Sequence, residues 1–145
     1  MTQPRSAWFS KCVLALVGAI YLYLALWCAI QPAVTSRLVG LTIEPGSGQS
    51  EFLTVYGGLE FGLALVFLMP FVKPHLVQAS LLSCLLIHGS LVAFRTVGFL
   101  LYEGIQPMTW KLATGEWAIL LLSAIAVFNQ SGYSGSENSG NTNCH

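Results

Sequence analysis

Long apolar runs alternate with short polar segments along this chain, and the pattern predicts four membrane-spanning helices. A helix needs about 20 apolar residues to cross the hydrocarbon core of a bilayer, which is about 30 Å thick. The runs that satisfy this requirement cover residues 12–31, 53–71, 76–102 and 109–128. The predicted fold is therefore an all-α integral membrane four-helix bundle.

The first run has an alternative interpretation, a secretory signal peptide, because basic residues precede it. The apolar part of a signal peptide holds about 7 to 15 residues, and the run from Cys12 to Ile30 is longer. A membrane span is therefore the favoured interpretation.

Residues 129–145 read NQSGYSGSENSGNTNCH and hold almost nothing that forms a core. A small and polar composition of this kind is typical of disordered segments. The chain is thus predicted to divide into a four-span membrane domain at 1–128 and a disordered polar tail at 129–145.

Basic residues in the short flanks of the spans indicate the orientation, because cytoplasmic loops carry more Lys and Arg. With four spans, Arg5, Lys11 and Lys73 lie on one side, against Arg37 and Lys111 on the other. This difference favours both termini in the cytoplasm.

Composition agrees with a chain built for lipid. Hydrophobic residues make up 54% and charged residues 8%, whereas soluble domains carry about 25% charged residues. Six Lys and Arg balance six acidic residues, which removes the case for a nucleic-acid partner. The sequence has no CxxC, HExxH, GxSxG or phosphate-loop motif, so no cofactor and no metal site are predicted. The expected partner is the lipid bilayer itself.

Three ionisable residues interrupt three different spans, and counting along the helices places them at one depth. Glu60 lies eight residues, or about 12 Å, into its span from Phe52. Arg95 lies seven residues, or about 10 Å, from Tyr102 at the same predicted boundary, and Glu116 lies equally deep in the fourth span. A charge that faces lipid costs at least about 2.5 kcal/mol. Arg95 is therefore predicted to bridge Glu60 and Glu116 inside the bundle.

These side chains and two neighbours form the candidate site. Two carboxylates against one guanidinium leave one carboxyl unpaired or protonated. Such a group suits general acid–base chemistry, so Glu60 and Glu116 are the candidate catalytic residues. Tyr56 shares a helical face with Glu60, and His88 lies about 10 Å deeper than Arg95. The candidate ligand-binding residues are Glu60, Arg95, Glu116, Tyr56 and His88.

Two further features carry their own expectations. His88 is predicted to be a core histidine hydrogen-bonded to Ser or backbone. The alternative is that His88 is a second polar site on a path that starts at the layer of Glu60, Arg95 and Glu116. Gly58 and Gly62 form a GxxxG pair, which predicts that a neighbouring helix packs closely against their face.

The stretch EFLTVYGGLEFGLALVFL, a third span ending in FRTVGFLLYEG and a fourth opening in GEWAILLL resemble an uncharacterised family of small four-helix bacterial inner-membrane proteins, a domain of unknown function. The resemblance covers roughly residues 10–128, and its most specific part is the Tyr-Gly-Gly-Leu-Glu motif at 56–60. It implies a four-helix membrane fold in a bacterial inner (plasma) membrane. It implies no activity, and it does not extend to the tail.

Three classes of function fit these observations. The first is a membrane-embedded protein or enzyme in which Arg95 holds an anionic or carbonyl group of a small lipophilic molecule and a Glu moves a proton. The second is an accessory subunit, as a homo-oligomer or with a membrane-protein partner, whose polar layer fixes helix register. The third is a proton-coupled carrier, which the arginine at the same depth and the lack of an internal repeat disfavour.

Overall fold

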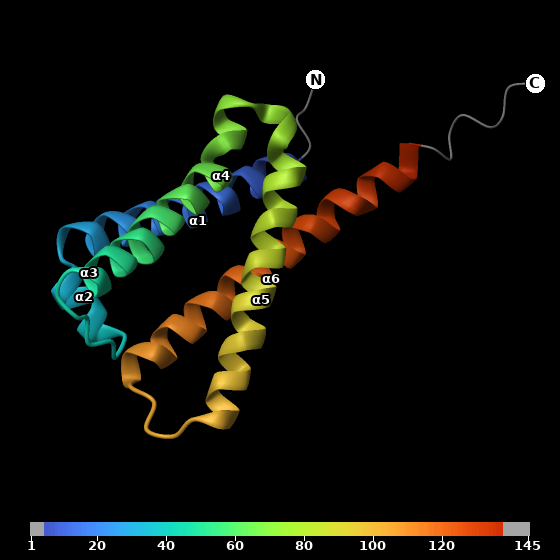
Figure 1. The fold of residues 1–145 in the computed structure, drawn as a ribbon. Helices are drawn as coiled ribbons and strands as arrows, with labels where there is room; N and C mark the ends of the chain where they lie inside the picture. Colours follow the sequence, from blue (N-terminus) through green and yellow to red (C-terminus); the bar gives the residue numbers. More distant parts are fainter. Residues whose placement is uncertain (1–4, 138–145) are drawn as a thin grey trace, which may run out of the picture.

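The computed structural model describes residues 5–137, and this part of the chain is helical without strands (Figure 1). The helices are α1 (Arg5–Ile30), α2 (Pro32–Leu38), α3 (Ser47–Phe52), the π-helix η1 (Leu53–Leu59), α4 (Glu60–Val72), the 3-10 helix η2 (Pro74–Leu76), α5 (Val77–Leu101) and α6 (Pro107–Glu137). The elements α3, η1 and α4 follow one another without a break, so Glu60 lies inside one continuous helix. The predicted all-α fold is confirmed.

Four helical stretches within the described residues are long and apolar enough to cross a membrane, as predicted. They cover Ala7–Ile30, Ser47–Val72, Pro74–Leu101 and Pro107–Asn129. The second begins earlier than predicted. Gly46 precedes it with a φ of +79°, which suits glycine, and the Gly46 N–H donates to Gln49 Oε1 at 3.3 Å. This turn starts the helix at Ser47.

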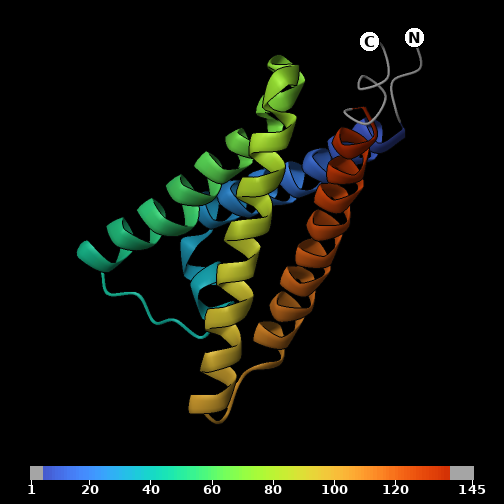
Figure 2. The same cartoon turned by 90° about the vertical axis from the view of Figure 1, so that its right-hand side faces the viewer.

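The helices associate mainly in two pairs. Figures 1 and 2 show α1 running alongside α4, and α5 beside α6. The helix α1 also contacts α5 and α6, and thereby joins the two pairs. The beginning of α1 and the end of α6 lie at the same end of the molecule (Figure 2), as an even number of spans requires.

The hydrophobic core lies in the half of the bundle nearer the α4–α5 turn. It contains residues of all four long helices, namely Val13, Leu14, Val17, Tyr21, Ala64, Phe67, Leu81, Cys84 and Ala126. The polar candidate residues of α5 and α6 lie beyond this core toward the α5–α6 turn.

A proline inside α4 explains one contact between helices. Pro70 has no backbone N–H, so the carbonyl of Val66, four residues earlier, loses its usual partner. The Ser80 hydroxyl of α5 donates to this carbonyl at 2.8 Å. Transmembrane helices tolerate proline where a neighbouring Ser or Thr satisfies the freed backbone group in this way.

Two glycines allow α1 to pack closely on the second span. Neither of them belongs to the predicted GxxxG pair. A Cβ built on Gly18 would lie 2.7 Å from Leu68 Cγ, and one on Gly57 would lie 3.8 Å from Ala29 Cβ. Nothing lies within 4 Å of a Cβ on Gly58 or Gly62 among the described residues. The predicted packing at Gly58 and Gly62 is therefore wrong within this chain, because α1 occupies the adjacent face.

The helix α6 continues to Glu137, where the sequence predicts that the disordered tail has already begun. Residues 129–137 contain no proline, and extending a formed helix adds a hydrogen bond for each residue fixed. Residues 138–145 lie outside the described part of the chain, so disorder there stays a prediction.

Candidate functional site

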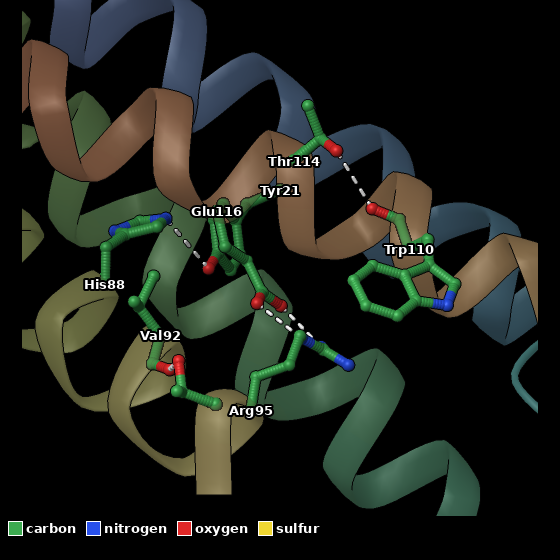
Figure 3. A network of polar contacts seen from close by, with 8 residues as sticks. Tyr21, His88, Val92, Arg95, Trp110, Thr114 and Glu116 are labelled. Atoms are coloured by element: carbon green, nitrogen blue, oxygen red, sulfur yellow. Dashed lines mark hydrogen bonds and ion pairs between the residues drawn. The ribbon is translucent and has the colours of Figure 1, made fainter. Parts of the chain in front are cut away.

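An ion pair joins the third and fourth spans. Arg95 Nε donates to Glu116 Oε2 and Arg95 Nη2 donates to Glu116 Oε1, both at 2.5 Å (Figure 3). The two side chains are 26% and 14% exposed, respectively. Such two-pronged pairs are among the stronger hydrogen-bonded contacts, because both partners are charged and their geometries match. The predicted pairing of Arg95 with Glu116 is confirmed.

Aromatic packing supports this pair from the side of the α5–α6 turn. The rings of Phe99 and Trp110 lie 4.2 Å apart between their centroids. Phe99 lies about one helical turn from Arg95 and Trp110 nearly two turns from Glu116, both toward the turn at 102–106. This contact holds α5 and α6 at a fixed spacing where the charged side chains meet.

A second polar cluster lies deeper and centres on His88, which is fully buried. His88 Nδ1 lies 2.8 Å from the Cys84 carbonyl oxygen, which only accepts hydrogen bonds, so Nδ1 carries the proton. His88 Nε2 then accepts from the Tyr21 hydroxyl at 3.3 Å. The prediction of a core histidine hydrogen-bonded to backbone is confirmed.

The same contacts bear on Cys84, whose thiol lies 3.7 Å from His88 Nδ1. A cysteine nucleophile needs a neighbouring base that accepts its proton. Here Nδ1 already donates to the Cys84 carbonyl, so it has no lone pair for the thiol. The Cys84–His88 arrangement is therefore a buried structural contact.

Glu60 does not join the ion pair. No hydrogen bond or ion pair connects Glu60 to Arg95 in the described chain, and Glu60 Oε2 is buried without a hydrogen-bond partner there. The predicted bridge from Arg95 to Glu60 is therefore wrong. The reason is α1, because α4 packs mainly on α1 while Arg95 belongs to the α5–α6 pair.

Tyr21 lies between the two carboxylates. Its side chain is within electrostatic range of both Glu60 and Glu116. Figure 3 shows its hydroxyl near His88 and beside the Arg95–Glu116 pair. Glu60 is also within electrostatic range of Cys28, which lies about two helical turns after Tyr21 on α1. Glu60, Tyr21 and the Arg95–Glu116 pair thus form a polar layer across the bundle.

Tyr56 lies in the π-helical segment just before Glu60. Its ring stacks on Phe52 with centroids 4.6 Å apart, and its side chain is within electrostatic range of Arg95. A π-helix is rare and shifts the faces of the residues that follow it. The segment sets the direction in which Glu60 leaves the helix, with Ala64 and Phe67 buried on the same face.

An open apolar groove of about 310 Å³ lies between α1 and the second span. Its lining consists of apolar residues and glycines, namely Ala25, Leu26, Ala29, Leu53, Gly57, Gly58 and Phe61. Ala25 of this lining shares a face of α1 with Tyr21 and Cys28, which lie four residues before it and three after it. The groove therefore borders the face of α1 whose residues are within electrostatic range of Glu60.

Two polar residues near Glu60 were not in the predicted set: Tyr21 and Cys28. The Cys28 thiol lies near the Thr35 side chain of α2. Ser36, the next residue, has a buried Oγ without a hydrogen-bond partner among the described residues. The first span is apolar on all sides, so its sequence gives no signal of which face meets Glu60.

The fold and the site define a class, a four-span helical protein with an ion pair between its third and fourth helices. Comparison with protein-family models, with curated proteins and with solved structures gave no match to this chain. The resemblance to a domain of unknown function with the motif at 56–60 thus stays a prediction. No group of three potential metal ligands occurs among the residues that the structure describes.

Proposed function

We propose that this chain is an integral protein of a bacterial inner membrane that binds a small lipophilic molecule at its polar layer. The layer comprises Glu60, Tyr21 and the Arg95–Glu116 pair. One observation carries the proposal, which is the buried Glu60 oxygen that accepts no hydrogen bond from the described residues. A buried acceptor left unsatisfied costs about 1–3 kcal/mol, more when charged, so a partner for it is expected.

The contrast between the two carboxylates supports a binding role. Glu116 has both oxygens engaged by Arg95, which fixes α5 against α6. Glu60 makes no such contact with the residues that the structure describes, so it does not lock two of their helices together. Ionisable groups inside membrane helices are costly and mark functional sites by default. A role for Glu60 in ligand binding accounts for its cost, whereas a register lock does not.

The experiment compares wild type with Glu60→Gln, using Glu51→Gln as the matched control. Glu51 is exposed at the start of the same helix, so the control makes the same chemical change away from the layer. Each protein is purified in one mild detergent and its bound molecules are identified by native mass spectrometry and lipidomics. We expect a small molecule bound to wild type and Glu51→Gln and lost from Glu60→Gln, with all three proteins folded.

Two outcomes contradict the proposal. The first is wild-type protein that carries only bulk lipid in every preparation. The second is a stably bound protein partner whose assembly weakens in Glu60→Gln, which is the result expected of an accessory subunit.

A further inference from the structure

The ionisable group left without a partner in the polar layer is an acid. The Arg95 guanidinium meets both oxygens of Glu116, so its charge is matched within the chain. Glu60 has no matching cation among the described residues. An anionic ligand at Arg95 would have to displace Glu116 and leave a second bare carboxylate in a poorly hydrated layer. The expectation that Arg95 holds an anionic group is thus disfavoured by the geometry.

A second unpartnered oxygen belongs to Ser36 of α2, the residue after Thr35, whose side chain lies near the Cys28 thiol. Ser36 Oγ is buried, and Ser36 itself is 1% exposed. Among the side chains that the structure describes, Ser36 Oγ and Glu60 Oε2 are the buried polar atoms without a hydrogen-bond partner. Of the two, Glu60 Oε2 belongs to an acid, so Glu60 is the group that a cationic donor would meet.

We infer that the ligand of this site is a lipophilic amine, whose ammonium group binds Glu60. This inference rests on the proposed function and names its ligand class. A primary ammonium carries three N–H donors and a positive charge, which suits an unpaired carboxylate. The alkyl part of the molecule would lie among the apolar side chains of the spans.

The route from lipid to site is consistent with this chemistry. An amine crosses hydrocarbon in its neutral form, since a charged group is costly there. At the site, the neutral amine takes the proton of the Glu60 carboxyl group. The products are an ammonium and a carboxylate, with the number of protons unchanged. The neighbouring Arg95–Glu116 pair takes no part in the transfer.

The test uses three probes of equal chain length, octylamine, octanoate and octanol, each radiolabelled. Binding is measured by equilibrium dialysis against the protein in phosphatidylcholine nanodiscs, and empty nanodiscs give the background. We expect saturable binding of octylamine alone. Glu60→Gln should weaken it by roughly thirtyfold or more, because the charge partner is lost.

Controls separate binding from folding. Glu51→Gln should bind octylamine like wild type, and Glu60→Asp, which keeps the charge, should retain much of the affinity. Saturable octanoate binding that Arg95→Ala abolishes would overturn the amine inference and leave the proposed function standing. Octylamine binding that is equal in wild type and Glu60→Gln, or not above that of empty nanodiscs, would overturn the inference as well.

Discussion

Replacing Glu116 by Gln should destabilise the protein far more than replacing Glu60 by Gln. Two unit charges about 4 Å apart attract by about 4 kcal/mol at an effective dielectric constant of 20. Removing one partner of a buried pair also leaves the other charge uncompensated, and the measured cost is about 3–5 kcal/mol. Arg95 is 26% exposed, which places Glu116→Gln near the lower end, at about 3 kcal/mol.

Thermal unfolding in one detergent, followed by circular dichroism, measures the difference. For soluble proteins of similar length, 1 kcal/mol shifts Tm by about 2–4 °C, so Glu116→Gln should lower Tm by roughly 6–12 °C. Glu60→Gln removes no ion pair within the described chain, so its Tm should equal that of wild type or exceed it. The double variant Arg95→Met with Glu116→Leu should recover most of the loss, because no bare charge remains.

Two results would refute this reasoning. One is an equal loss of Tm in Glu60→Gln and Glu116→Gln, which would mean that both carboxylates hold Arg95. The other is a double variant no more stable than Glu116→Gln alone, which would mean that the pair does not act as a unit.

Further predictions concern how the helices pack. Ser80→Ala should cost about 1–2 kcal/mol by thermal unfolding, and this cost should shrink in a Pro70→Ala background, where residue 70 regains its N–H. Gly18→Ala should destabilise by about 1–3 kcal/mol through a clash with α4, whereas Gly58→Ala, which meets open space, should be neutral or stabilising in the same assay. Tyr21→Phe should leave the fold intact and cost about 1 kcal/mol, because it removes the hydrogen bond to the buried histidine.

The sequence predicts the contact between the third and fourth spans because both can be counted from one turn. Arg95 lies six residues before the end of α5 and Glu116 nine residues after the start of α6, so helical rise alone brings them within about 5 Å of one level. The cost of a charge in lipid then requires that they face each other. Depth and charge together were sufficient for this pair.

Depth was not sufficient for Glu60. The same counting gives its level along the helix, but not which neighbour its face meets. That depends on where α1 packs, and α1 is apolar around its whole circumference, with Tyr21 and Cys28 among residues that look interchangeable in sequence. The position of α1 is decided by close contacts such as that of Gly18 with Leu68, which no periodicity reveals. The partner of Glu60 was therefore mispredicted, although its burial was not.

The two carboxylates of the layer allow a direct comparison of what a fold needs with what a site needs. Glu116 shows how this chain treats a carboxyl that stabilises it, since both oxygens meet donors on a neighbouring helix. Glu60 lies in a helix packed just as closely on its neighbour, beside the buried Ala64 and Phe67, yet the described chain offers its buried oxygen no donor. A glutamine there would carry no charge at any pH, so packing alone does not explain the acid. If folding were the only constraint, Glu60 would be the weaker choice, and a ligand that supplies the missing donor reverses that preference.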